Sequence, residues 1–334
     1  MLILGIESTC DETGVALVEN GRTILANEIS SSVPLYKKYG GVIPEIAARE
    51  QIKIIIPLIE TVVSKDAIPK IDAIAVSYGP GLIGSLLIGV ETAKSFAVAW
   101  DKRLIAVNHL VGHFYASWLS AEIEPVFPAV GLIVSGGHTD LLFFESHKKF
   151  RHLGGTNDDA AGEAFDKIAR FLGLGYPGGP EIEDIAKKYS DKNAKREKIF
   201  FPKPMINSQD FNFSFSGLKT SVANYVTKNN IKSESDKSKV AYYFQDAITA
   251  VLLSKTVKAV KKNGAKSIIV GGGVAANSKL RSLLNLQGSL LDIPVFFPDK
   301  IYSVDNGAMI ASAAFYQQNF VDALTLSADS GLHF

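Results

Sequence analysis

Two histidines four residues apart are the part of the sequence whose chemistry is easiest to name. His109 and His113 follow Asn108, a good helix N-cap residue, so a helix would project both imidazoles from one face. Such a pair suits a divalent metal, and Asp305, near the start of the last apolar helix, is the best third ligand. A zincin-type protease would need a glutamate general base after the first histidine, where this chain has Leu110. The alternatives are two half-buried structural histidines and a helix-capping role for Asp305.

Two glycine-rich turns after apolar strands are candidates for binding a negatively charged group. Ser135-Gly136-Gly137 ends one strand, and Gly271-Gly272-Gly273 joins another to a helix that begins near Asn277. Glycine lets backbone N–H groups approach an anion, and a helix N-terminus favours negative charge. A tight hairpin would explain the first turn alone, but three glycines after a buried strand are harder to explain by turn geometry. There is neither a Walker motif nor a dinucleotide fingerprint after the first strand, so we expect any nucleotide to lie between two lobes.

Several carboxylates stand where they could accept hydrogen bonds or protons. Asp166 falls inside a predicted helix, and Glu183 follows the rigid turn 175–180, where a carboxylate could accept ribose hydroxyls. A simple helix-capping turn explains the second feature equally well. Asp11 and Glu12 lie in a polar turn between two apolar runs.

The apolar segments predict an α/β fold with two duplicated lobes. Runs at Leu2–Ile6, Val15–Val18 and Thr23–Ile29 predict an antiparallel meander, with Asn20-Gly21 as a hairpin turn. A similar pattern begins at Ala129, and in each half a strand–glycine loop–helix unit follows. We therefore expect an N-terminal lobe over residues 1–124 and a C-terminal lobe over 125–320. The second lobe would carry a basic insertion, or loops between helices, at about 190–240, and residues 321–334 would form a mobile tail.

The composition favours a soluble protein of a reducing compartment. The chain has 334 residues, of which 47% are hydrophobic and 21% charged, which is enough apolar material for two cores. A single cysteine, Cys10, excludes an internal disulfide framework. No run is long and apolar enough for a membrane span, and no cationic segment precedes the first apolar run. We expect a cytoplasmic protein with no membrane contact.

The net charge of +1 conceals a basic block. Residues 187–281 contain 19 Lys or Arg and 6 Asp or Glu, a balance of +13, which leaves −12 for the rest of the chain. Such a block suits a polyanion such as RNA, and a solvated lysine-rich surface is the alternative.

Taken together, the motifs identify a family. The chain resembles the catalytic subunit of the bacterial tRNA threonylcarbamoyladenosine synthase, a family long regarded as O-sialoglycoprotein endopeptidases. The resemblance covers essentially residues 1–320 and rests on these segments in this order: Gly5–Thr13, Gly79–Gly81, Asn108–His113, Ser135–Thr139, Asp166-Lys167, Gly178–Pro180, Phe213–Thr220 and Gly271–Asn277.

This resemblance implies the fold, the reaction and the site residues. The fold would be that of the actin, hexokinase and heat-shock chaperone ATPase superfamily, with a nucleotide cleft between its lobes. The reaction would transfer a threonylcarbamoyl group from threonylcarbamoyl-adenylate to N6 of the adenosine beside the anticodon, in tRNAs reading codons that begin with A. The metal, usually described as iron (Fe2+) in this family, would be held by His109, His113 and Asp305. The adenylate would contact Ile133, Val134, Ser135, Gly136, Gly137, Asp166, Gly179, Glu183 and Asn277.

The resemblance also suggests a mechanism and partners. Some relatives have a tyrosine ligand at the position of Ile133, so we expect three protein ligands here and open positions for substrate oxygens. Backbone N–H groups of Ser135–Gly137 would stabilise the phosphate leaving group, and Asp11 or Glu12 would accept the N6 proton, with Asp11 preferred. The partners would be tRNA, an inactive paralogue of the same fold docked on helices such as Ile43–Val63, and a small P-loop ATPase.

Three other functions fit parts of the sequence. A metal-dependent glycoprotease lacks its base at Leu110. A small-molecule kinase of the same superfamily does not explain the two histidines. A nucleotide-gated scaffold without enzymatic activity does not explain why Asp305 accompanies both histidines.

Overall fold

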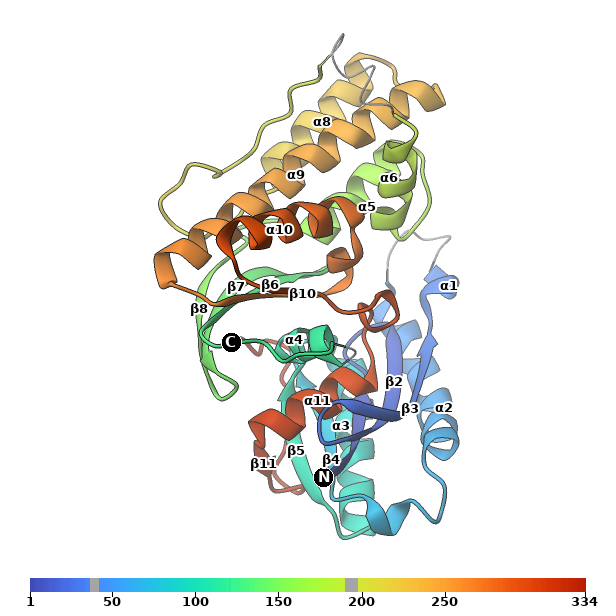
Figure 1. Ribbon diagram of the computed structural model, residues 1–334. Helices are drawn as coiled ribbons and strands as arrows, with labels where there is room; N and C mark the ends of the chain where they lie inside the picture. The colour runs from blue at the N-terminus through green and yellow to red at the C-terminus, as the bar shows by residue number, and fades with distance from the viewer. Residues whose placement is uncertain (37–41, 120, 190–197) are drawn as a thin grey trace. The chain divides into compact units, whose positions relative to one another are not determined.

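The protein is described from a computed structural model that covers residues 1–36, 42–119, 121–189 and 198–334 (Figure 1). The chain forms two compact units, one of residues 1–124 with 297–334 and the other of residues 125–296. The predicted boundary at Glu124 coincides with this division. The C-terminal limit differs, because residues from Phe297 onward belong to the first unit and not to a lobe that runs to residue 320.

The first unit is built on a six-stranded mixed sheet in the order β11-β5-β4-β1-β2-β3. The predicted meander is confirmed: β1 pairs with β2, and β2 with β3, in antiparallel fashion, whereas β1, β4 and β5 are parallel. Asn20 and Gly21 both have positive φ, as a tight hairpin between twisted strands requires. The strands are β1 (Leu2–Glu7), β2 (Glu12–Glu19), β3 (Thr23–Ser31), β4 (Ala73–Gly79), β5 (Arg103–Asn108) and β11 (Phe320–Val321).

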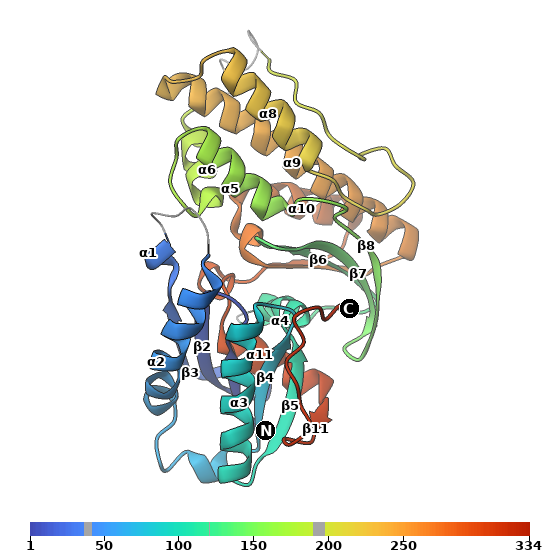
Figure 2. The same cartoon turned by 180° about the vertical axis from the view of Figure 1, so that it is seen from behind.

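Helices cover both faces of this sheet. Figure 1 shows α11 in front of the strands, and Figure 2 shows α2 and α3 on the opposite face. Helix α11 approaches β1 closely, because a Cβ atom on Gly5 would lie 2.1 Å from the carbonyl oxygen of Gly307. The helices are α1 (Val33–Tyr36), α2 (Pro44–Val62), α3 (Ile83–Ala99), α4 (His109–Tyr115) and α11 (Gly307–Gln317), with short 3-10 turns at Ile68–Lys70, Ala116–Trp118 and Lys300–Tyr302.

The second unit contains a five-stranded sheet in the order β10-β9-β6-β7-β8. The second predicted meander is confirmed as β6, β7 and β8, and β9 joins β6 in parallel. The strands are β6 (Ala129–Val134), β7 (Thr139–Ser146), β8 (Lys149–Gly155), β9 (Ser267–Gly271) and β10 (Val295–Phe296). The helices gather on one face of this sheet: α5 (Ala161–Phe171), α6 (Gly178–Lys187), α8 (Ser216–Lys228), α9 (Glu234–Asn263) and α10 (Ser278–Leu291), with a 3-10 turn at Gly273–Ala276 (Figure 1).

Two sequence-based expectations are wrong. Loops between helices, one of the two alternatives for residues 190–240, do not describe this segment, because it contains α8 and the start of α9; Asp158 accepts the N–H groups of Phe215 and Ser216 at the start of α8. The C-terminal tail is packed and not mobile: β11 pairs with β5, and Asn108 Nδ2 donates to the carbonyl of His333. Among the described residues, no helix combines the length and the apolar character that crossing a bilayer requires.

Candidate functional site

Helix α4 presents the two histidines as the sequence predicted. Asn108 caps the helix, and its Oδ1 accepts hydrogen bonds from the N–H groups of Leu110 at 2.9 Å and Val111 at 3.4 Å. Both imidazoles are buried, with 7% of His109 and 2% of His113 exposed. Strand β5 ends at Asn108, and the cap starts α4 at the next residue, which determines the position of both histidines.

Asp305 completes a three-residue group suited to a metal ion. Its Oδ1 lies 3.7 Å from His109 Nε2 and 3.3 Å from His113 Nε2. One ligand atom from each residue falls within a group no wider than 4.8 Å. Asp305 lies just before α11, whose N-cap Asn306 accepts from the N–H of Met309. Two imidazole nitrogens and a carboxylate oxygen are a donor set that fits Zn2+, Fe2+ or a similar divalent ion.

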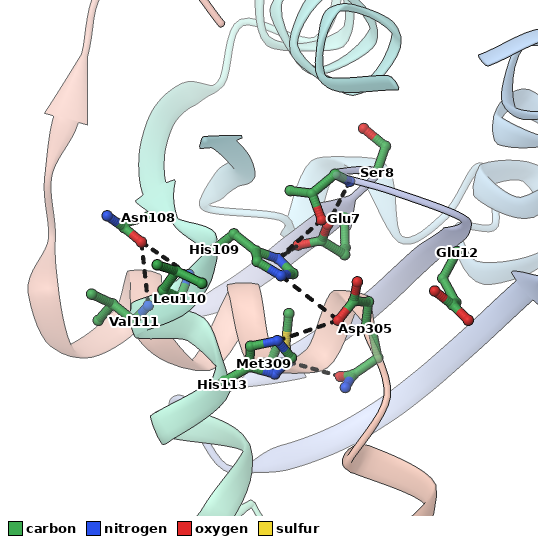
Figure 3. A network of polar contacts seen from close by, with 12 residues as sticks. Glu7, Ser8, Glu12, Asn108, His109, Leu110, Val111, His113, Asp305 and Met309 are labelled. Atoms are coloured by element: carbon green, nitrogen blue, oxygen red, sulfur yellow. Dashed lines mark hydrogen bonds and ion pairs between the residues drawn. The ribbon is translucent and has the colours of Figure 1, made fainter. Parts of the chain in front are cut away.

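Glu7, which the sequence analysis did not single out, holds the first histidine. Figure 3 shows His109 between Glu7 and Asp305, and Glu7 Oε2 lies 2.9 Å from His109 Nδ1. The other oxygen of Glu7 accepts the N–H of Thr9 at 2.7 Å, and the Glu7 side chain is fully buried. A carboxylate at Nδ1 selects the tautomer that carries its proton there, which leaves Nε2 free to bind a metal.

The carboxylates also change the proton affinity of His109. Burial by itself lowers the pKa of an imidazole, but Glu7 and Asp305 outweigh burial and raise the pKa of His109 to about 9. Without a metal, His109 is therefore protonated at neutral pH. His113 differs, because its Nδ1 is buried and has no hydrogen-bond partner in the part of the chain that the structure describes. Packing and the Nε2 contact with Asp305 orient that ring: its centroid lies 4.7 Å from that of His109, in an edge arrangement.

The turn between β1 and β2 brings Glu12 close enough to Asp305 for their charges to interact, and Asp11 is its neighbour in the turn. Burial, together with the charges of Asp305 and Asp11, raises the pKa of Glu12 to about 10. Burial, and then Asp11, also raises the pKa of the Cys10 thiol, which makes this thiol a poor nucleophile. Figure 3 shows Glu12 on the same side of the site as Asp305.

The predicted anion-binding turns meet within the second unit. Gly162, in the first turn of α5, donates its N–H to the carbonyl of Ser135 at 3.1 Å. Gly272 has φ +86°, and a Cβ atom there would lie 2.5 Å from the carbonyl oxygen of Val134. Around Gly136 and Gly137 a Cβ atom would meet nothing within 4 Å. The two turns and the start of α5 thus form one cluster with open backbone at Gly136 and Gly137.

The remaining predicted adenylate residues lie in the same unit, but some already have partners. Asn277 Nδ2 donates to Gln245, and its Oδ1 caps α10 by accepting the N–H of Leu280 at 3.0 Å. One oxygen of Asp166 accepts the N–H of Gly178 at 2.6 Å. Buried Ile133 and Val134 are residues of β6, so only their backbone could meet a ligand.

Glu183 and Gly179 complete that set. Glu183 accepts from the hydroxyl of Ser278 at 2.7 Å and pairs with Lys187 at 2.8 Å. Burial alone would raise the pKa of Glu183, but Lys187 and Ser278 outweigh burial and lower it. A Cβ atom on Gly179 would meet nothing within 4 Å. Glu183 therefore orders the start of α10 beside the glycine turn 271–273.

Comparison with known structures supports the predicted fold. The structure of HypF from T. kodakarensis superposes with a TM-score of 0.60 at 14% identity, over 94% of this chain and 47% of that one. The activator of the 2-hydroxyisocaproyl-CoA dehydratase from Clostridium difficile, with bound ADPNP, gives a TM-score of 0.53 at 14% identity, over 94% of both chains. These likenesses confirm the two-lobed α/β fold of the actin and hexokinase type.

Comparison of sequences identifies the family. The family model described as tRNA N6-adenosine threonylcarbamoyltransferase matches residues 23–312. Proteins of that name from Symbiobacterium thermophilum and Moorella thermoacetica are 46% and 47% identical to this chain, each over 94% of it and 91% of their own length. The chain belongs to the tRNA N6-adenosine threonylcarbamoyltransferase family, and is a tRNA-modifying transferase.

Proposed function

We propose that this enzyme transfers the threonylcarbamoyl group from threonylcarbamoyl-adenylate to N6 of the adenosine adjacent to the anticodon, in tRNAs reading codons that begin with A, and releases AMP in the cytoplasm. The observation that carries the proposal is the cluster of His109, His113 and Asp305 in a chain of this family. The cluster also argues against a kinase, which would have no use for two convergent imidazoles.

The metal ligands would be these three residues, with Glu7 behind His109. A bound divalent ion, which we propose to be iron (Fe2+), would supply a Lewis acid for a substrate carbonyl or carboxylate. Three protein ligands leave coordination positions open for substrate, as catalytic metal sites do.

Within the chain, we assign the proton-accepting role to Asp11. In the metal-free protein, burial and the charges of Asp305 and Asp11 raise the pKa of Glu12, which favours Asp11 over Glu12 as the group that accepts the proton. Exocyclic amines are weak nucleophiles, so much of the rate would come from holding N6 beside the carbonyl carbon. The backbone N–H groups of Gly136 and Gly137, where an added Cβ atom would meet nothing within 4 Å, would stabilise the charge of the leaving phosphate.

We propose that partners bind on two surfaces. Exposed apolar residues on the outer face of α2 and α3 suit an inactive paralogue of the same fold, and a small P-loop ATPase would join that complex; these residues are Ile52, Ile56, Ile83 and Leu87. Ile55 and Leu58 of α2 are buried in the core and do not contribute.

The tRNA would contact the basic block. Within that block, Lys192, Lys195 and Arg196 lie outside the described residues. Lys198, Lys228 and Lys232 are exposed. Lys219, by contrast, pairs with Asp159 at 2.5 Å and is only 23% exposed, so we exclude it from the tRNA surface.

The proposal is tested with the purified chain, its partner proteins, threonylcarbamoyl-adenylate and unmodified tRNA. Modified adenosine and AMP should form in equal amounts. His113→Ala should abolish both products, and His152→Ala, which alters an exposed histidine of the second unit, is the matched control. Adenylate consumption without tRNA modification, or full activity of the His113→Ala variant, would contradict the proposal.

A further inference from the structure

The turn that carries Asp11 and Glu12 has its backbone carbonyls hydrogen-bonded to neighbouring elements. In Ser8–Glu12, each of the five backbone carbonyls accepts a hydrogen bond from a group beyond the turn. The donors come from α2, from the segment that leads into α3, from α3 itself and from the end of β3; they are Gln51, Leu82, Ser85 and Ser32.

Gln51 alone serves three of these carbonyls. Its Nε2 lies 3.0 Å from the carbonyl oxygen of Cys10, 3.2 Å from that of Glu12 and 3.4 Å from that of Ser8. The two hydrogens of the amide NH2 group are shared among these three acceptors, which together fix the orientation of the side chain. Among the described side chains, Gln51 is the donor to the carbonyls of Ser8 and Glu12. The carbonyl of Cys10 accepts from both Gln51 and Ser85.

Gln51 occupies a position where the helix would ordinarily carry an apolar residue. It is 1% exposed and shares the buried face of α2 with Ala47, Ile55 and Leu58. Its Oε1 is buried without a hydrogen-bond partner among the described residues. A buried amide with an unpaired oxygen destabilises the fold, so the contact with the turn is the evident use of this residue.

Helix α3 supports the same turn from the other side. Ser85 Oγ donates to the carbonyl of Cys10 at 3.1 Å, and Ser8 Oγ donates to the carbonyl of Ser85 at 3.1 Å. The backbone N–H of Leu82 reaches the carbonyl of Thr9 at 2.8 Å. Gly89 leaves the space for the Ser8 hydroxyl, because a Cβ atom there would lie 2.1 Å from Ser8 Oγ.

We propose that Gln51 is a positioning residue: its amide, together with Ser85, fixes the backbone of Ser8–Glu12 and thereby aims Asp11 at the transferred group. The inference rests on the proposed function, since it assigns Asp11 a proton to accept. It adds that α2, which carries the exposed Ile52 and Ile56, is tied directly to the catalytic turn.

The test is Gln51→Met, which keeps the length of the side chain and removes its donor. Because a displacement of about 1 Å can reduce the rate about 10²-fold, we expect kcat to fall by about that factor. KM for the adenylate and the affinity for Co2+ should change little, since Gln51 contacts neither the metal ligands nor the second unit's glycine turns. Ile59→Ala is the matched control, because Ile59 is buried further along α2, and this variant loosens the helix without touching the turn.

The outcomes separate the two hypotheses. If the wild-type enzyme transfers no threonylcarbamoyl group, the proposed function fails. If the wild type is active and Gln51→Met retains its kcat, or if Ile59→Ala loses as much, the positioning role alone is refuted. Should Gln51→Met not fold, Ser85→Ala tests the same turn, and the inference predicts a fall in kcat with unchanged Co2+ affinity; an unchanged kcat would overturn it.

Discussion

Replacing Glu7 by Gln tests how the buried carboxylate acts on the metal site. The substitution keeps the volume of the side chain and removes its charge beside His109 Nδ1, which lies 2.9 Å away. Two opposing effects follow. The metal loses a charged group that orients its ligand, and the proton that competes with the metal for His109 loses a carboxylate that stabilises it.

The sizes of the two effects on metal affinity show at which pH each one dominates. With a pKa of about 9, His109 of the metal-free wild type is protonated at pH 7, which weakens apparent metal affinity by about 10²-fold relative to high pH. Loss of the orienting carboxylate should weaken the intrinsic affinity by about 10–100-fold. Because the pKa of His109 falls in the variant, the two effects nearly cancel at pH 7. Wild type and variant should therefore bind metal similarly at neutral pH and diverge as the pH rises.

The assay is chelator-buffered Co2+ titration of both proteins from pH 6 to pH 9.5. Wild-type affinity should rise about tenfold per pH unit and level off near pH 9, and the Glu7→Gln curve should level off earlier at a lower value. Glu19→Gln, at the exposed end of β2, is the control and should follow the wild type. Equal affinities at pH 9.5, or a wild-type curve that is flat between pH 7 and pH 9, would refute the reasoning.

Other substitutions test the remaining assignments. His113→Ala should lose most of its bound metal, as measured by elemental analysis; full occupancy would exclude the site. Asp166→Ala should weaken adenylate binding by about 1–3 kcal/mol if its carboxylate accepts ribose hydroxyls, and calorimetry with unchanged affinity would remove that role. Burial and the nearby charges of Asp305 and Asp11 raise the pKa of Glu12 from 4.5 to about 10, so between these pH values the metal-free folded protein keeps a proton that the unfolded chain releases, and its stability falls as pH rises. Glu12→Gln should accordingly raise the melting temperature at pH 8 and not at pH 4, and equal shifts at both would contradict the assignment. Reversing Lys228 and Lys232 to Glu should weaken tRNA binding and flatten its salt dependence by about 1–2 in log–log slope, with adenylate binding intact; unchanged tRNA affinity would place the tRNA elsewhere.

The sequence was most informative where local geometry decides the outcome. A helix brings residues four apart onto one face, so His109 and His113 could be paired without knowledge of the fold. Strand periodicity and the Asn20-Gly21 turn likewise predicted the first meander. Asp305 was a weaker inference, because its place beside the pair depends on the close approach of α11 to β1.

The role of Glu7 beside His109 could not be predicted from helix spacing or strand periodicity. Glu7 ends β1, and His109 follows β5, two strands away in the sheet order. Because β1, β4 and β5 are parallel, their carboxyl ends meet at one edge, and this places Glu7 beside His109. The strand order carries this information, and periodicity within one segment does not.

The errors have the same origin. The tail lacks periodicity, yet Asp329 donates its N–H to the carbonyl of Tyr78 and Leu326 is 8% exposed, so tertiary contacts order it. In the second unit, both ends of the Asn277 side chain have intramolecular partners, and its contact with the adenylate stays a prediction.

The short turn after β1 explains why metal and base residues occur so close together in this sequence. Thr9 donates its N–H to Glu7, and its carbonyl accepts from Leu82. Its Oγ1 lies 3.2 Å from His109 Nδ1. Glu7, which holds the proposed metal ligand His109, is therefore joined through Thr9 to the backbone that carries Asp11, the proposed base. The contacts of α2 and α3 with this turn end on the carbonyls of Ser8, Cys10 and Glu12, so a partner bound on the outer face of these helices would act on Asp11 through Gln51 and Ser85.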